Sequence, residues 1–207
     1  MIIYMYRVMC FTNRKLCDED YIKRLTDIAY SEISATVLRE KDLSEDEYYE
    51  LAKKVNEIYK KAGKTLILHN FYKVAKRLDI DKIHLPLSVL ESMSEEERAY
   101  FKILGASCHS IEDAVKAQKY GCTYITAGHI YATDCKRGVS PRGLDFLREI
   151  THKVSIPVWA IGGISMDNIE EVVSCGAYGG CIMSGLMKND YETLNKKSGT
   201  QSPSSTK

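Results

Sequence analysis

The stretch IPVWAIGGISMDNIEEVVSCGAYGGCIMSGL, from Ile156 to Leu186, alternates between two kinds of segment. Apolar runs at 157–161 and 180–183 flank a segment of helical spacing that extends from Ser165 to Gly176. A strand, a helix and a second strand in this order form a βαβ unit, whose two strands lie parallel in one sheet. The stretch therefore predicts an α/β fold.

The same alternation continues toward the N-terminus. EDEYYELAKKVNEIYKKAG follows Ser44, a favourable N-cap residue, and ends at Gly63, while SIEDAVKAQKYG is bounded by Ser110 and Gly121. Strands are expected near 5–11, 35–39, 65–69, 82–85, 102–107, 123–128, 157–161 and 180–183. Eight strands about 25 residues apart predict a compact (β/α)8 TIM barrel, with a doubly wound open sheet as the alternative.

The length of 207 residues suits a single domain with one hydrophobic core. We assign residues 1–189 to the barrel. The segment at 190–207 is rich in Ser, Thr and Lys and has few apolar residues, which is typical of a disordered tail. The eighth helix, which precedes this tail, is therefore expected to be short or frayed.

Charge and cysteine content narrow the class of partner. The 29 Lys and Arg residues nearly balance the 28 Asp and Glu residues, so nothing in the sequence indicates binding to nucleic acid or a membrane. The seven cysteines include no C-x-x-C pair, which favours reduced thiols. The N-terminal MIIYMYRVMCF lacks the basic region and cleavage site of a signal peptide and resembles a first strand. We expect a cytoplasmic protein with a small-molecule ligand; a homo-oligomer is possible.

Glycines follow the last two expected strands. Gly162 and Gly163 come directly after the seventh strand, and Ser184 and Gly185 follow the eighth, after Met183. In (β/α)8 barrels these two loops commonly bind phosphate through backbone N–H groups that glycine leaves accessible. Glycines also simply end strands, but two such signals at both expected places favour a phosphate site.

Two cations follow the second expected strand. Arg39 and Lys41 flank Glu40, and residues two apart in a strand point the same way, so both cations can face the mouth of the barrel. The alternative is a solvated run of charges before a helix.

Four histidines are expected at strand ends, namely His69, His84, His109 and His129. Several imidazoles on one rim suggest a metal site. However, the sequence has no H-x-H or H-E-x-x-H spacing, and no carboxylate stands beside these histidines to orient them. We therefore expect no metal site, and we assign structural roles to His69 and His84.

Five segments occur in the order of one known family. LREKD, GASCHS, YITAGHIYATDCKRG, IPVWAIGGI and IMSG, within about residues 5–187, resemble the thiamine-phosphate synthase superfamily. GHIYATDCKRG is similar to the thiazole tautomerase branch, because synthases usually carry proline at the position of His129 and a T-x-T-K run in place of TDCK. The resemblance implies an isomerase of thiamine biosynthesis that aromatises a carboxythiazole phosphate tautomer without metal or redox cofactor, with His129 moving the proton.

The resemblance leaves two alternatives. A synthase would join hydroxymethylpyrimidine diphosphate to thiazole phosphate with Mg²⁺, but the family's two magnesium-binding aspartates correspond to Phe71 and Val89, and its glutamine beside the diphosphate to Val37. Apolar side chains cannot bind Mg²⁺, which needs oxygen ligands, so Mg²⁺ is expected only if this alternative holds. The second alternative is a non-catalytic regulator that binds a thiazole or thiamine phosphate.

The expected site combines strand-end position with the family pattern. His129 is the catalytic residue, and Cys135 is taken as a free thiol in the same loop. The expected phosphate-binding residues are Gly162, Gly163, Met183, Ser184 and Gly185; the charged residues facing the substrate are Arg39, Lys41 and Lys136; and the remaining lining residues are Asn70, Ser107, His109 and Thr133.

Overall fold

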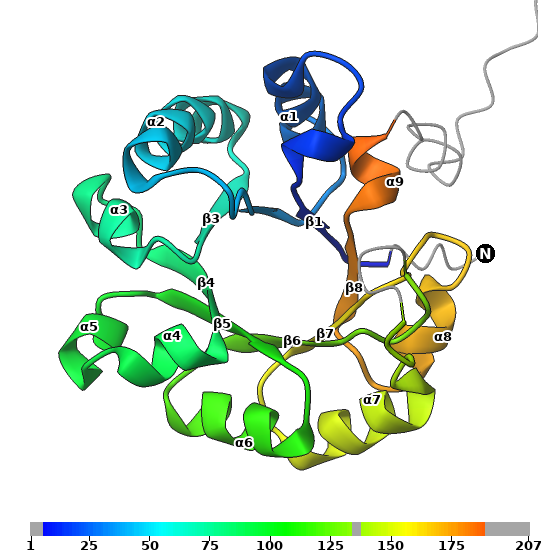
Figure 1. The fold of residues 1–207 in the computed structure, drawn as a ribbon. Coiled ribbons are helices and arrows are strands. Elements are labelled where there is room, and N and C mark those ends of the chain that lie inside the picture. The colour runs from blue at the N-terminus through cyan, green and yellow to red at the C-terminus, as the bar shows by residue number, and fades with distance from the viewer. Residues whose placement is uncertain (1–5, 134–137, 189–207) are drawn as a thin grey trace, which may run out of the picture.

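The protein forms a closed barrel of eight parallel strands with helices around the outside, as Figure 1 shows in a view along the barrel axis. The computed structural model describes residues 6–133 and 138–188. Strand order around the barrel follows chain order from β1 to β8, and β1 pairs with β8 to close it. This confirms the (β/α)8 barrel and excludes the open sheet. The predicted tail at 190–207, Cys135 and Lys136 lie outside the described residues.

The observed strands lie close to the expected ones. They are β1 (Val8–Phe11), β2 (Ala35–Leu38), β3 (Thr65–His69), β4 (Lys82–Pro86), β5 (Ile103–Cys108), β6 (Tyr124–Gly128), β7 (Val158–Ile161) and β8 (Gly179–Ile182).

The helices fill the connections between strands. They are η1 (Arg14–Leu16), α1 (Tyr21–Ala29), α2 (Glu45–Ala62), α3 (Tyr72–Arg77), α4 (Leu87–Ser92), α5 (Glu95–Ala99), α6 (Ile111–Lys119), α7 (Gly143–Lys153), α8 (Ile169–Ser174) and α9 (Ser184–Met187). The last of these, α9, is a single short turn, so the prediction of a short final helix is confirmed.

Local sequence explains where the longest helix begins and ends. Ser44 accepts a hydrogen bond from the backbone N–H of Glu47, whose side chain accepts one from the backbone N–H of Ser44. This capping box satisfies N–H groups that have no partner within the helix. At the other end Gly63 has a left-handed backbone with φ 64°, which glycine adopts without steric cost.

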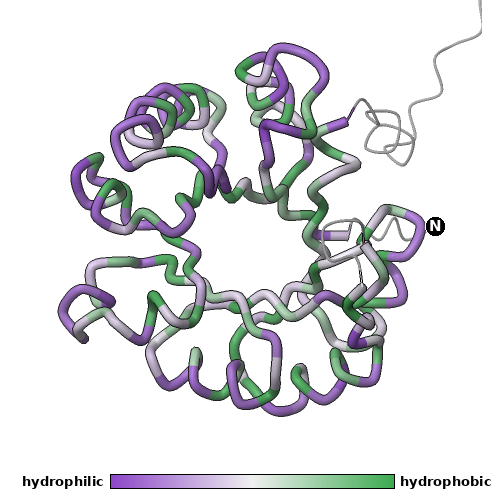
Figure 2. The backbone as a smooth tube through the Cα atoms, viewed as in Figure 1, coloured by the Kyte–Doolittle hydropathy of each residue, from purple (hydrophilic) through white to green (hydrophobic). Residues whose placement is uncertain are grey.

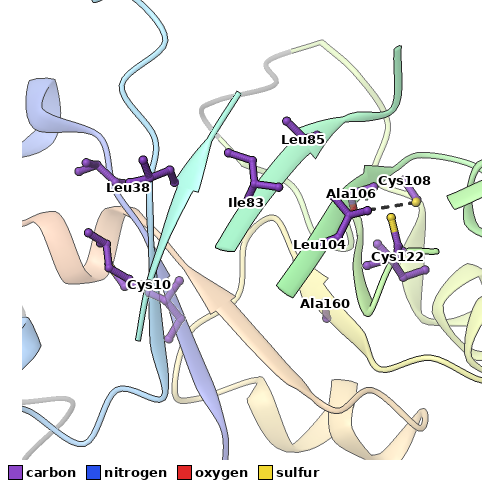
Figure 3. Close-up of a cluster of buried hydrophobic side chains, with 14 of the residues drawn as sticks. Cys10, Leu38, Ile83, Leu85, Leu104, Ala106, Cys108, Cys122 and Ala160 are labelled. Atoms are coloured by element: carbon purple, nitrogen blue, oxygen red, sulfur yellow. Dashed lines mark hydrogen bonds between the residues drawn. The ribbon is translucent and has the colours of Figure 1, made fainter. Parts of the chain in front are cut away.

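Two apolar clusters lie on opposite faces of the sheet. The inner cluster fills the barrel and consists of Met9, Phe11, Val37, Ile67, Tyr124, Trp159 and Cys181. The larger outer cluster packs the strands against the helices, and Figure 3 shows part of it, including Cys10, Leu38 and Ile83. In Figure 2 the strands are mainly hydrophobic and the solvent side of the helices is mainly hydrophilic. Side chains that alternate along each strand therefore reach two separate cores.

The cysteines within the described residues are free thiols, as expected: Cys10, Cys17, Cys108, Cys122, Cys175 and Cys181. Burial raises the pKa of the Cys122 thiol to about 12 and that of Cys181 well above its usual value, so both stay protonated at neutral pH. No helix among the described residues is long and apolar enough to cross a membrane.

Candidate active site

A cavity of about 470 Å³ opens at the carboxyl ends of the strands, where (β/α)8 barrels carry their active sites. Most of the residues expected at the site line it: Arg39, Lys41, Ser107, His109, His129, Thr133, Gly162, Gly163, Met183 and Ser184. These residues lie at or beyond the carboxyl ends of five different strands, β2, β5, β6, β7 and β8, and are far apart in the sequence. Closure of the barrel brings them together around one space.

Two expected residues are not part of the cavity lining. Asn70 has a left-handed backbone with φ 68°, and its N–H donates to the carbonyl of His84 at 3.0 Å, so it turns the chain out of β3 into α3. Gly185 lies within α9, one residue beyond the lining residue Ser184. Each of the two residues is next in the chain to a lining residue, His69 or Ser184, and is not itself part of the lining.

His129 lies directly after β6 and is 4% exposed. Its Nε2 is 3.3 Å from the carbonyl oxygen of Val139, which can only accept a hydrogen bond, so Nε2 carries the proton. Its Nδ1 is buried and has no hydrogen-bond partner among the residues that the structure describes. An imidazole nitrogen without a hydrogen-bond partner keeps a lone pair that can accept a proton, and His129 is one of the residues that line the cavity.

The glycines after β7 are needed for packing as well as for access. Gly162 has φ 98°, and a Cβ added to it would collide with the Cβ of His129. The carbonyl of Gly162 accepts a hydrogen bond from the N–H of Tyr131 at 3.0 Å, which holds the loop after β6 against the end of β7. Gly162 thus sets the position of His129 while its own backbone lines the cavity.

The charge run after β2 is divided between two faces. Arg39 and Lys41 both line the cavity, whereas Glu40 is 2% exposed and points into the protein. Glu40 accepts hydrogen bonds from the hydroxyl groups of Thr12 at 2.7 Å and Tyr21 at 2.6 Å. The interpretation as a solvated charge run is therefore wrong, because the buried carboxylate ties the end of β2 to the segment after β1.

His69 and His84 lie side by side, with ring centroids 5.9 Å apart. Burial lowers the pKa of His84 to about 3, and burial, with the nearby His84, Arg39 and Lys41, places the pKa of His69 well below its usual value. Both rings are therefore neutral at pH 7. His69 is at the end of β3, as expected, and lines the cavity. His84 was expected at a strand end, but it lies in the middle of β4.

The cavity also contains residues that the sequence did not single out. Thr126 is 1% exposed, and its Oγ1 has no hydrogen-bond partner within the described part of the chain. The alternation within β6 carries the signal, since Tyr124, Thr126 and Gly128 all point into the barrel. Asp113 borders the cavity too, but its carboxylate accepts from the backbone N–H groups of His109 and Ser110 at 2.8 and 3.1 Å.

Comparison with known proteins places this barrel in a family. The family model described as thiamine monophosphate synthase matches residues 8–186. The chain belongs to the thiamine-phosphate synthase family. A putative thiamine-phosphate synthase 2 of Aquifex aeolicus is 36% identical over 84% of this chain and 93% of its own. A thiamine-phosphate synthase of Caldanaerobacter subterraneus is 33% identical over 90% and 91%.

Among solved structures, the thiamine phosphate pyrophosphorylase of Pyrococcus furiosus superimposes with a TM-score of 0.78 at 29% identity, over 93% of each chain. Membership of the thiamine-phosphate synthase family supports an enzyme of thiamine biosynthesis that acts on small phosphorylated substrates. The names of these relatives correspond to the synthase alternative, and the choice between synthase and tautomerase depends on the site residues of this chain.

The magnesium positions of the family do not fit a metal in this member. The ring of Phe71 packs on the ring of Tyr48 with centroids 4.5 Å apart, and Val89 packs against the outer apolar cluster. Neither side chain carries an oxygen, and no group of three or more His, Cys, Asp and Glu side chains within 6–133 and 138–188 has an arrangement that suits a metal ion.

Proposed function

We propose that this member of the family is a thiazole tautomerase, which converts a carboxythiazole phosphate tautomer to its aromatic form. The observation that carries the proposal is His129, which lines the cavity and whose buried Nδ1 has no hydrogen-bond partner among the described residues. The reaction breaks a C–H bond of the ring and forms one at the exocyclic carbon, with no net oxidation. A group that takes a proton and returns it nearby is sufficient for this step.

The rest of the cavity suits the charges of such a substrate. Arg39 and Lys41 provide positive charge at the end of β2, appropriate for the substrate carboxylate and for the negative charge that develops in the ring. Gly162, Gly163 and Ser184 provide backbone N–H groups at the ends of β7 and β8 for the phosphate. Lys136, in the segment outside the described residues, is proposed to add a further cation.

The test is an assay of ring aromatisation by absorbance with purified protein. We expect His129→Asn to bind the aromatic product as the wild type does and to lower kcat by about 100-fold or more, because removal of a general base typically costs this much. His152→Asn is the matched control, since His152 is exposed on α7 and is not one of the residues that line the cavity. An unchanged rate in His129→Asn would remove this residue from the mechanism.

The names of the relatives make synthase activity the second candidate. It is tested by incubating the protein with hydroxymethylpyrimidine diphosphate, thiazole phosphate and Mg²⁺. Formation of thiamine phosphate at useful turnover would overturn the proposal that the protein is solely a tautomerase. Tight binding of thiazole phosphate without turnover in either assay would instead support the non-catalytic regulator.

A further inference from the structure

Three side chains form a hydrogen-bonded chain inside the barrel. The Nδ1 of His84 is 2.9 Å from the hydroxyl of Tyr124, and its Nε2 is 2.9 Å from the hydroxyl of Ser107. Tyr124 and His84 are buried in the inner core, whereas Ser107 lines the cavity. The chain therefore links a phenol deep in the barrel to a hydroxyl that faces the ligand space.

The imidazole is held in one orientation from both sides. The ring of Phe11 meets the ring of His84 edge-on, with centroids 5.3 Å apart, and the ring of His69 is stacked on it at 5.9 Å. Gly105 makes room for the phenol, because a Cβ at this position would collide with the Tyr124 ring. The two nitrogens of His84 thus stay directed at Tyr124 and Ser107.

The hydrogen bonds that join Tyr124, His84 and Ser107 have one favourable direction of donation. The hydroxyl of Tyr124 makes its hydrogen bond to His84, and within the described ranges it has no other acceptor. If His84 donated to Tyr124, the phenol proton would be buried without an acceptor, which costs more than an unused lone pair. Tyr124 therefore donates to Nδ1. A neutral imidazole then carries its proton on Nε2 and donates it to the Ser107 oxygen.

Because His84 donates to the Ser107 oxygen, the Ser107 hydroxyl cannot donate its own hydrogen bond to His84. The neighbours of Ser107 across the sheet are Pro86 and Thr126, and among the described residues it makes no hydrogen bond to either. The Ser107 O–H is consequently available to the cavity as a donor. Arg39, Lys41 and the glycine backbone provide for charged groups at the ends of other strands, which leaves Ser107 for a neutral part of the ligand.

We propose that Tyr124 and His84 are positioning residues that hold the Ser107 hydroxyl as a hydrogen-bond donor toward a neutral acceptor, the ring nitrogen of a heteroaromatic substrate. The direction of donation, from Tyr124 through His84 to Ser107, is a property of the ligand-free protein. The identity of the acceptor rests on the proposed function. The consequence is specificity: a ring with an acceptor at this place is bound, and a ring with a C–H group there leaves the Ser107 proton without a partner.

The first experiment reads the direction directly. Long-range proton–nitrogen correlation spectra of protein labelled with nitrogen-15 histidine show which ring nitrogen carries the proton. At pH 7 we expect the proton of His84 on Nε2, with the signal assigned through its contact with Phe11. His152 is the internal reference, because its Nδ1 faces the carbonyl oxygen of Arg148 at 2.6 Å and must be protonated. A proton on Nδ1 of His84 would overturn the inference whether or not the protein is a tautomerase.

The second experiment measures the specificity. Binding of thiazole phosphate is compared with binding of the thiophene phosphate, in which a C–H group replaces the ring nitrogen. We expect the wild type to prefer the thiazole by about fivefold to tenfold, and Ser107→Ala to bind both equally. Tyr124→Phe should lower the preference, because His84 can then accept from Ser107 in its other tautomer.

If Ser107→Ala still prefers thiazole phosphate to thiophene phosphate as strongly as the wild type, the role of Ser107 is overturned. If Tyr124→Phe keeps the full preference, Tyr124 is not a positioning residue. If His84 carries its proton on Nε2 and the wild type binds both rings equally, the assignment of the acceptor is wrong. If the preference is present but no tautomer is converted, the proposed function fails while the inference stands.

Discussion

Gly162 lies beside His129 with a left-handed backbone, and the space that it leaves is as important as its own N–H group. A Cβ at this position would collide with the Cβ of His129, so any side chain would displace the imidazole. The Nδ1 of His129, which has no hydrogen-bond partner within 6–133 and 138–188, and the packing of Gly162 therefore belong to one arrangement at the junction of β6 and β7. Misplacement of a catalytic group by about 1 Å can cost roughly 100-fold in rate.

We expect Gly162→Ala to lower kcat by about 10- to 100-fold and to destabilise the protein by at least about 1 kcal/mol. Gly121→Ala is the matched control, because Gly121 has φ 84° but no atom within 4 Å of an added Cβ. Gly121→Ala should lose stability, because alanine at positive φ is strained, and should keep full activity. Urea unfolding and the aromatisation assay measure the two effects, and equal activities in the two variants would contradict the link to His129.

At the scale of elements, Glu40 connects the first two βα units. Besides Thr12 and Tyr21, it accepts hydrogen bonds from the backbone N–H of Arg14 at 3.1 Å, and Arg14 also forms an ion pair with it at 3.2 Å. The N–H of Arg39 donates to the Thr12 hydroxyl at 2.8 Å, so the same network fixes the backbone next to the cavity cations. The network thereby couples the stability of the β1–α1 connection to the geometry of the site.

Glu40→Gln would place an amide N–H₂ group among buried donors and remove the charge that partners Arg14. We expect a loss of about 3 kcal/mol in the free energy of unfolding and a raised KM, since Arg39 and Lys41 lose their fixed backbone. Asp42→Asn is the control: its carboxylate pairs with Arg14 and Lys15 at the surface, and there we expect no measurable change in KM. An unaltered stability in Glu40→Gln would show that the network is not structural.

At the scale of the whole molecule, the two buried histidines make stability depend on pH. Both have pKa values lowered by folding, and that of His84 falls to about 3. Below about pH 6.5 the unfolded chain binds protons that the folded protein cannot bind, so unfolding becomes easier as the pH falls. The stability contributed by neutral His84 is fully present above its unfolded pKa and is lost between about 6.5 and 3.

The free energy of unfolding should therefore decrease by up to about 1.4 kcal/mol per pH unit for each of these two histidines as the pH falls below about 6. Urea unfolding at pH 7, 6 and 5 measures the slope. In His69→Gln the slope should be smaller, whereas His152→Gln, which keeps both buried imidazoles, should retain it. A slope that does not change in His69→Gln would show that other groups control acid unfolding.

Local signals in the sequence were sufficient for the order of elements. Helix caps such as Ser44 and Ser110 and the stop at Gly63 act through neighbours within a few residues, so the pattern of the chain contains them. Position at strand ends likewise placed Arg39, Lys41 and His129 at the mouth of the barrel, because all parallel strands of a barrel end at the same face. The family pattern was needed to select His129 from the four histidines expected there.

The same reasoning put His84 at a strand end, expected Asn70 in the cavity lining and overlooked Thr126. The expected and observed ends of β3 agree, so Asn70 differs because of its left-handed backbone, φ 68°, which the sequence pattern does not show. For His84, one or two residues of uncertainty at a strand end decide whether a side chain lies at the rim or within the barrel. His84 and Tyr124 are 40 residues apart in the chain, so no local pattern shows that they meet.

The alternation of strands and helices, the caps, the glycines at strand ends and the set of residues from which the site is drawn can all be identified in the sequence. The pairing of β1 with β8, the choice of rim residues that enclose the cavity, and the described polar atoms that lack a partner became evident from the three-dimensional fold. The two differ in the sequence separation over which the interactions act. Propensity and capping act between neighbours in the chain, whereas barrel closure, burial and hydrogen-bond direction depend on contacts between strands far apart in sequence.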